Sequence, residues 1–376
     1  MTSYFDCNST TPVEPVVAEL VRRYLEEEFG NSGSRTHEFG SRAKAAVAKA
    51  RGQVAGLVDS DPSEVVFTSG ATESNNIAIL GLEKTLEAQG RTHVLTTAVE
   101  HKAVLEPLER LAERGFEVEH VTPDEEGRIS ANDFAERLRP ETGLVSSMHV
   151  NNETGVIHPI QEIADVLDGH QAFFHVDAAQ GFGKVSGLES SRIDLISISG
   201  HKVYAPKGVG ALITRRRGVE RAPLTPIMVG GGQERGLRPG TVPVHLVVGL
   251  GEAARLAKEE RNSRAERCGE IRTELMTAFD GFDFSVNGAP DQVVVSTLNI
   301  SLHGVDAEAA IVCLKGVVAV SNGAACTSSS YSTSHVLEAM GLPEDRIRGS
   351  LRWSWSHLTE DPPVAKIRRA LAVLGI

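Results

Sequence analysis

Ser197-Ile198-Ser199-Gly200-His201-Lys202 places a lysine directly behind an apolar strand, with two hydroxyl groups and an imidazole around it. Aliphatic residues alternate with Asp and Ser over residues 193–199, which predicts the strand, and Gly200 then turns the backbone. The following Ala205-Pro206-Lys207-Gly208 prevents a helix from starting at once. A lysine held in such a corner can lose its solvation and become nucleophilic, although most Gly-His-Lys tripeptides are solvated turns. The neighbouring motifs therefore decide its role.

Strand-like and helical segments alternate on both sides of this stretch. Short apolar runs occur at residues 65–67, 94–96, 144–149, 173–176 and 195–198. Helical patterns separate them, for example at residues 102–113 and 160–167. Such alternation predicts an α/β fold, with a mostly parallel sheet and helices on both faces. In this architecture ligands bind at the carboxyl ends of the strands.

The length of the chain predicts two domains. With 376 residues, of which 41% are hydrophobic, it exceeds the size of about 250–300 residues at which single cores stop growing. The highly charged stretch at residues 252–276 predicts one long solvated helix that bridges the domains. We expect a large domain over residues 12–255 and a smaller α/β domain built from residues 1–11 and 256–376.

Charge and hydropathy exclude several classes of protein. The net charge of −12 repels phosphate backbones, so we expect no direct binding of nucleic acid. Arg215-Arg216-Arg217 is the one tight basic cluster, which is typical of a solvated turn and leaves docking of an acidic partner open. No apolar run approaches a membrane span, and residues 1–6 lack the features of a signal peptide. We expect a soluble cytoplasmic protein that does not bind membranes.

Two further motifs accompany Lys202. Residues 68–76 follow the first predicted strand and open a helix, where orphan amides and the helix dipole can bind phosphate. Asp177 ends the buried strand that precedes the strand before Lys202. By itself, an aspartate in this place is typical of a turn or a helix cap. Pyridoxal phosphate (PLP) needs all three features: a lysine amine, a phosphate site and an anion that keeps the pyridine nitrogen protonated.

The three motifs in this order resemble fold-type-I PLP enzymes, and the details resemble the cysteine desulfurases of the NifS/IscS group. The matching stretches extend along nearly the whole chain: Asp6 with Thr10-Thr11-Pro12, Gly30-Asn31-Ser32, residues 69–76, Glu100-His101-Lys102, and residues 150–155, 175–180, 199–202, 230–241 and 321–327, with Arg352. The resemblance implies a fold-type-I PLP-dependent transferase with PLP as its cofactor.

The resemblance also implies which residues act on the substrate. Lys202 would bind the cofactor covalently and later move protons. His101 would stack on the ring face and assist proton transfer. Asn152 and Arg352 would bind the substrate carboxylate, because a guanidinium fork matches the geometry of a carboxylate. Asn152 would also contact the cofactor.

The remaining cofactor contacts follow from the same resemblance. Asp177 would pair with the pyridine nitrogen and Gln180 with the phenolic oxygen. Thr241 would reach the phosphate from a second subunit, so a homodimer is implied. Within one subunit the phosphate would be held by Ala71, Thr72, Ser199 and His201.

The four cysteines have to be judged one by one. They include no CxxC pair, so the sequence predicts neither a disulfide framework nor a structural zinc site, and we expect no metal. Cys313 lies in an apolar helical segment, Cys268 in the charged one, and Cys7 near the expected site without a role. Cys326 lies in a loop of small residues, 321–330, in the smaller domain. Because sulfur transfer needs a thiol that moves, we predict Cys326 as the catalytic cysteine.

The expected reaction converts L-cysteine to L-alanine and a persulfide on Cys326, for transfer to an acceptor protein. Three alternatives stay open: another PLP reaction on this scaffold, such as that of a selenocysteine lyase or an aminotransferase; a docking scaffold without activity; and a metal or cluster ligand role for Cys326. The acceptor could serve iron-sulfur cluster assembly, tRNA thiolation or DNA phosphorothioation. Residues 28–36 and 351–357 resemble the DndA branch of DNA-phosphorothioation systems more than the housekeeping enzymes.

Overall fold

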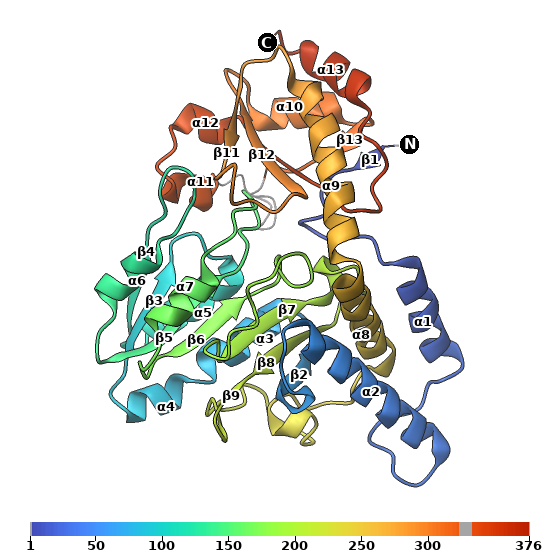
Figure 1. The fold of residues 1–376 in the computed structure, drawn as a ribbon, viewed down its shortest axis with the longest axis vertical. Coiled ribbons are helices and arrows are strands. Elements are labelled where there is room, and N and C mark those ends of the chain that lie inside the picture. Colours follow the sequence, from blue (N-terminus) through green and yellow to red (C-terminus); the bar gives the residue numbers. More distant parts are fainter. Residues whose placement is uncertain (1, 323–332, 376) are drawn as a thin grey trace.

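A seven-stranded sheet forms the larger part of the fold (Figure 1). The computed structural model describes residues 2–322 and 333–375. The strands lie in the order β2-β8-β7-β6-β5-β3-β4; the run from β7 to β4 is parallel, and β8 is antiparallel to both of its neighbours. The predicted, mostly parallel sheet is confirmed. The strands are β2 Val65–Thr68, β3 His93–Thr97, β4 Glu117–Val121, β5 Thr142–Met148, β6 Phe173–Asp177, β7 Leu195–Ser199 and β8 Gly210–Thr214.

Helices cover both faces of this sheet, as the alternation of segments predicts. One apolar cluster packs α1, α2, α6, α7 and α8 on one face, and another packs α3, α4 and α5 on the other. Among the described residues, none of the helices combines the length and the apolar character needed to cross a membrane. The helices are α1 Pro15–Glu26, α2 Glu38–Leu57, α3 Ala71–Leu80, α4 Glu83–Ala88, α5 Lys102–Ala112, α6 Ala131–Arg137, α7 Ile160–Val166 and α8 Val244–Glu259.

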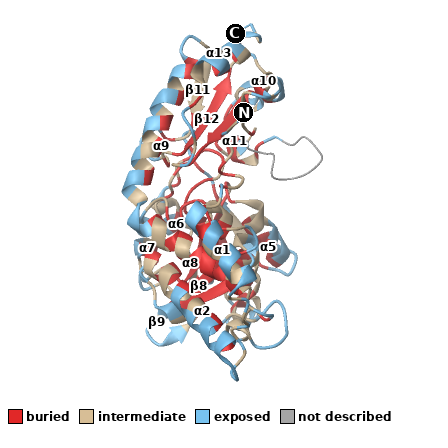
Figure 2. Cartoon of the chain, turned by 90° about the vertical axis from the view of Figure 1, so that its right-hand side faces the viewer, coloured by how far each residue is buried: buried red, intermediate tan, exposed pale blue. Residues whose placement is uncertain are grey.

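A second, smaller sheet has its own apolar core (Figure 2). Its strands β11 Phe284–Asn287, β12 Thr297–Leu302 and β14 Ser350–Ser354 are antiparallel. Phe5, Trp353 and Trp355 are fully buried in this core, and the ring centroid of Phe5 lies 6.1 Å from that of Trp353 and 6.2 Å from that of Trp355. Strand β1 (Ser3–Tyr4) pairs in parallel with β13 (Val318–Ala319), so the N-terminus joins this part of the fold. The helices here are α9 Arg261–Met276, α10 Ala307–Leu314, α11 His335–Ala339, α12 Glu344–Arg348 and α13 Val364–Ala372.

The predicted bridging helix is broken at Glu260, which separates α8 from α9. Helix α8 packs in the core of the large sheet, whereas α9 packs in the core of the small one, so the break at Glu260 lies between the two cores. The predicted domain boundary after residue 255 falls inside α8 and stays a proposal. Helices α3 and α4 are separated at Gly81, where a Cβ would lie 2.2 Å from the carbonyl oxygen of Ile77.

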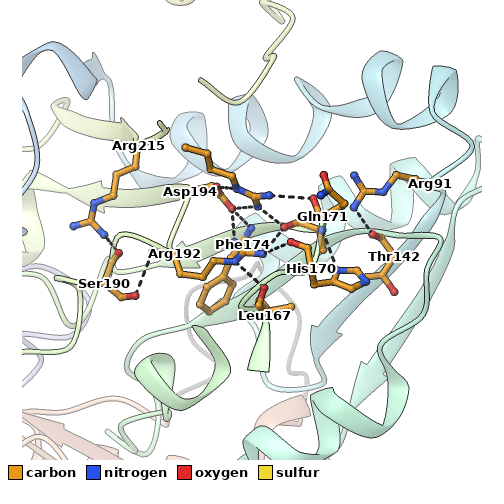
Figure 3. A network of polar contacts seen from close by, with 12 residues as sticks. Arg91, Thr142, Leu167, His170, Gln171, Phe174, Ser190, Arg192, Asp194 and Arg215 are labelled. Carbon is orange, nitrogen blue, oxygen red and sulfur yellow. Dashed lines mark hydrogen bonds and ion pairs between the residues drawn. The ribbon is translucent and has the colours of Figure 1, made fainter. Parts of the chain in front are cut away.

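Two of the three arginines of the basic cluster, Arg215 and Arg217, are structural, which corrects the interpretation of the cluster as a solvated turn, whereas Arg216 is exposed. Figure 3 shows Arg215 beside Ser190, and Asp194 nearby. Arg215 is 5% exposed, and its guanidinium donates to the carbonyl oxygens of Val58, Leu188 and Ser190. Arg217 binds both carboxylate oxygens of buried Asp194, at 2.6 and 2.7 Å. These arginines satisfy backbone carbonyls and a buried charge, so they are not available to an acidic partner.

Candidate active site

A cavity of about 520 Å³ lies at the carboxyl ends of the central strands. Residues that follow β2, β5, β6 and β7 line it, together with Arg352 of β14. The fold therefore gathers ten of the twelve predicted site residues around one space: Ala71, Thr72, His101, Asn152, Asp177, Gln180, Ser199, His201, Lys202 and Arg352. Thr241 is exposed and does not line the cavity, and Cys326 lies outside the described residues.

Lys202 ends a short 3-10 turn, Gly200–Lys202, directly after β7. Its Nζ donates to the carbonyl oxygen of Ser9 at 2.8 Å and to that of Asn8. The strands around this turn are closely packed, because a Cβ at Gly210 would lie 2.4 Å from the carbonyl oxygen of Ile198 and 2.6 Å from the Cα of Gly70. Tight strand packing and two carbonyl acceptors thus hold the amine in the cavity.

Asp177 is fixed at the end of β6 by two hydrogen bonds. Its Oδ2 accepts from Asn75 Nδ2 at 2.8 Å, and its Oδ1 accepts from the backbone N–H of Ala179 at 2.9 Å. The side chain is 5% exposed and lines the cavity. A carboxylate held in this way suits a pyridinium N–H as its remaining partner.

The N-terminus of α3 meets the residues after β7 at one side of the cavity. Ala71 and Thr72 open this helix, so their backbone N–H groups are among its orphan donors. The Nδ1 atom of His201 is buried without a hydrogen-bond partner, and burial, aided by nearby Lys202, lowers the pKa of this histidine to about 4. A neutral imidazole with an unpartnered ring nitrogen and a helix N-terminus fit the phosphate group of PLP.

His101 forms the N-terminal cap of α5. Its Nδ1 accepts a hydrogen bond from the backbone N–H of Ala103 at 3.0 Å, so in the neutral ring the proton is on Nε2. Burial lowers the pKa of His101, while the charge of Asp177 acts in the opposite direction. The preceding Glu100 is fully buried and anchors the turn: its Oε1 accepts from Thr97 Oγ1 and from the backbone N–H of Met148, both at 2.7 Å.

Gln180 is oriented by hydrogen bonds on both ends of its amide. Its Nε2 donates to the carbonyl oxygen of Asn8 at 2.8 Å, and its Oε1 accepts from Lys184 Nζ at 3.3 Å. Because Lys184 fixes Oε1 as the acceptor end of the amide, the second N–H of Gln180 Nε2 remains as a donor toward the cavity. Such a donor suits a phenolate oxygen. Burial lowers the pKa of Lys184 to about 8.

Arg352 reaches the cavity from β14 of the small sheet and is 1% exposed. Its Nη2 donates to Asp6 Oδ1 at 2.7 Å and to Ser9 Oγ at 3.0 Å, and its Nη1 donates to the carbonyl oxygen of Asn152 at 3.2 Å. Its Nε is buried without a hydrogen-bond partner. The guanidinium is thus rigidly placed and keeps N–H groups for a further acceptor.

Sequence reasoning did not identify several residues that organise the site. Their roles depend on contacts between distant segments. Asn8 and Ser9 stand next to Asp6, and Asn75 lies in the phosphate motif, so a motif search could have flagged them without showing what they contact. Nothing in the local pattern marks Glu100 as buried or places Lys184 beside Gln180.

Two of the three described cysteines, Cys7 and Cys268, are poor nucleophiles. Burial raises the pKa of Cys7 to about 11 and that of Cys268 to about 12, so both remain thiols at neutral pH. Cys313 is half-buried in α10.

One group of residues outside the cavity has ligand atoms spaced for a metal ion: His93, Glu117 and Glu119. Arg139 already compensates both carboxylates, at 2.8 and 2.7 Å. We therefore assign no metal to this group, and the expectation of a metal-free protein stays a prediction.

Comparison with known proteins identifies the family. The aminotransferase class-V family model matches residues 3–360. The chain is 44% identical over 365 residues to the cysteine desulfurase IscS of Edwardsiella ictaluri, which covers 96% of this chain and 89% of that protein. The structure of DndA from Streptomyces lividans is 53% identical with a TM-score of 0.82, and the match covers 93% of this chain and 98% of that one. The structure of SspA in complex with cysteine is 39% identical with a TM-score of 0.84, and the match covers 94% of this chain and 98% of SspA. The chain therefore belongs to the cysteine desulfurases of the aminotransferase class-V family, which are enzymes that depend on PLP.

Proposed function

We propose that Lys202 anchors PLP in the cavity, with Asp177 facing the pyridine nitrogen and the N-terminus of α3 holding the phosphate. The observation that carries this proposal is the meeting of a lysine, a buried hydrogen-bonded carboxylate and a helix N-terminus in one cavity. When bound, PLP would withdraw electrons from the Cα of an amino acid. Substrate binding, proton transfer and attack on the substrate sulfur would be carried out by side chains of the protein.

The proposed substrate is L-cysteine, which SspA was solved with. Arg352 would bind the substrate carboxylate through N–H groups that the protein does not use, and Asn152 would support it. Lys202 would take the Cα proton and later return a proton to the substrate, with the Nε2–H of His101 assisting. These two groups reach the cavity from different strands, so both can act on one bound substrate.

Sulfur leaves the substrate by attack of the Cys326 thiolate on the substrate sulfur. A sulfur-sulfur bond forms and the carbon-sulfur bond breaks, with its electron pair remaining on the substrate carbon. That carbon takes up a proton, so one L-cysteine and one thiol give one L-alanine and one persulfide. The persulfide sulfur then passes to an acceptor protein.

The role of Cys326 is tested by Cys326→Ser, with Cys313→Ser as the matched control. We expect the Cys326 variant to remain yellow with bound PLP but to lose alanine and sulfide production, whereas the control keeps both. Full turnover by the Cys326 variant would remove this residue from the mechanism. Formation of a keto acid in place of alanine would instead indicate an aminotransferase.

The anchor is tested by borohydride reduction of the yellow protein followed by peptide mapping. Reduction should fix the cofactor to Lys202. A label on any other residue, or a protein that refuses added PLP, contradicts the assignment.

The active unit proposed is a homodimer in which Thr241 completes the partner subunit's phosphate site. Its loop, residues 230–241, is fastened to its own subunit: Glu234 accepts from Arg51 at 2.5 and 2.8 Å and from the backbone N–H of Phe67 at 2.8 Å. Mixing Lys202→Ala and Thr241→Ala subunits should restore activity, because one site of each mixed dimer would be intact. No restoration would place Thr241 in its own subunit's site, and full activity of Thr241→Ala by itself would place it outside both sites.

The proposed sulfur acceptor belongs to a DNA-phosphorothioation system. The desulfurase itself would be a cytoplasmic enzyme that does not bind DNA. The support is the higher identity to DndA, 53%, than to the IscS of E. ictaluri, 44%. Iron-sulfur cluster assembly and tRNA thiolation are the competing routes. Neighbouring genes for DNA-modification proteins would agree with the proposal, whereas genes for cluster scaffolds would contradict it.

A further inference from the structure

The N-terminal segment places an acidic side chain against the buried guanidinium of the site. Asp6 lies between β1 and the turn that carries Asn8 and Ser9, and it is 346 positions away from Arg352 in the chain. The two side chains form an ion pair with Nη2 and Oδ1 2.7 Å apart, where the arginine is 1% and the aspartate 21% exposed. Backbone hydrogen bonds to Ser354 anchor the same segment independently of this ion pair.

Asp6 supplies the charge that compensates Arg352. Among the described residues, it is the one carboxylate within ion-pair distance of this guanidinium. The other acidic group nearby, Glu153, is fully buried, and burial raises its pKa, which favours its neutral form. Its Oε2 is in addition occupied by Ser334 Oγ. A substrate carboxylate therefore approaches a guanidinium that is already partly neutralised.

The protein uses three of the five N–H donors of Arg352, two of them on Nη2 and one on Nη1. The Nε–H and the second Nη1–H remain. The Nε atom is buried without a hydrogen-bond partner, and Arg352 lines the cavity.

We propose that Asp6 is a specificity-determining and positioning residue, which fixes the orientation of Arg352 and weakens its attraction for the carboxylate of bound amino acids. The proposal rests on the proposed function, in which Arg352 binds that carboxylate. Substrate and product are both amino acids, so a contact that is equally strong with both increases retention without accelerating the reaction. Asp6 keeps this contact weak enough for alanine to leave and L-cysteine to replace it.

The charge of Asp6 is tested with Asp6→Asn in the PLP-loaded protein. Asparagine keeps an Oδ1 acceptor for Nη2 and all the backbone bonds, and removes only the charge. We expect the Kd for L-alanine, measured by absorbance titration, to fall about tenfold, which is the effect of one charge at ~6 Å in a medium with a dielectric constant of about 40. The Kd for ethylamine, which lacks a carboxylate, should not change.

Two further variants separate charge from structure. Asp6→Glu keeps the charge and should retain the wild-type Kd for L-alanine, and Asp280→Asn removes an exposed charge elsewhere in the small-sheet region and should also leave it unchanged. An equal Kd for L-alanine in the wild-type protein and in Asp6→Asn overturns the proposal for Asp6. Equal binding of ethylamine and L-alanine by the wild-type protein would instead refute Arg352 as the carboxylate site, and with it that part of the proposed function.

Discussion

The substitution Glu100→Gln tests whether a buried carboxyl group beside His101 is kept neutral. Glu100 is fully buried, its Oε2 has no hydrogen-bond partner, and burial, with a smaller effect of Asp177, raises its pKa to about 8. The group is therefore protonated in the folded protein at neutral pH. Glutamine reproduces the protonated form and keeps the oxygen that accepts from Thr97 and Met148.

The magnitude follows from the two pKa values of this group. The ordinary value is 4.5, so between about pH 4.5 and 8 the folded state holds a proton that the unfolded state has lost. The free energy of unfolding therefore falls as the pH rises through this range, and the penalty at pH 7 is about 3 kcal/mol, from ~1.4 kcal/mol for each pH unit above 4.5. Below the ordinary pKa the penalty vanishes, because both states are protonated.

The assay is urea unfolding of the wild-type protein and Glu100→Gln at pH 5 and pH 8. We expect the variant to gain about 3–4 kcal/mol relative to the wild type on going from pH 5 to pH 8. Glu109→Gln, an exposed change on α5, serves as the control and should show no such difference. Parallel pH dependences for the wild type and Glu100→Gln would refute the idea that Glu100 is neutral in the folded state.

Three other substitutions test packing and charge around the site. Glu234→Gln leaves the partly buried guanidinium of Arg51 without its carboxylate and should cost about 3 kcal/mol in urea unfolding; a loss below about 1 kcal/mol would show that the pair is not needed. Lys184→Met removes a cation beside the Gln180 amide, so the pH midpoint of the visible absorption of bound PLP should move to higher pH, and an unchanged midpoint would exclude this lysine as an influence on the cofactor. Gly210→Ala forces a Cβ to within 2.4 Å of a backbone oxygen and should weaken PLP binding at least about tenfold by displacing the N-terminus of α3; an unaltered dissociation constant would mean that the strands can separate without consequence.

The order of strands and helices could be read from the chain because it follows from local patterns. Buried strands of four to seven residues, such as β2 and β5, appear as short apolar runs, and the helices between them have an amphipathic period. Strand β4 was missed because it lies at an edge of the sheet and carries polar residues. The break between α8 and α9 was missed because charge and helix propensity continue through Glu260, while the cores on which the two helices pack do not.

The sequence by itself determined which chemistry is possible, because the lysine after a strand, the aspartate at a strand end and the capped phosphate turn are all local motifs. Only the tertiary structure decided how these groups are held. Asn75 reaches Asp177, the turn at Asn8 and Ser9 accepts from Lys202, and Asp6 pairs with Arg352. These contacts join segments that are up to 346 positions apart, and no local pattern can encode them. Burial of Glu100 is decided in the same way, since desolvation depends on everything that packs around a group and not on its neighbours in the chain.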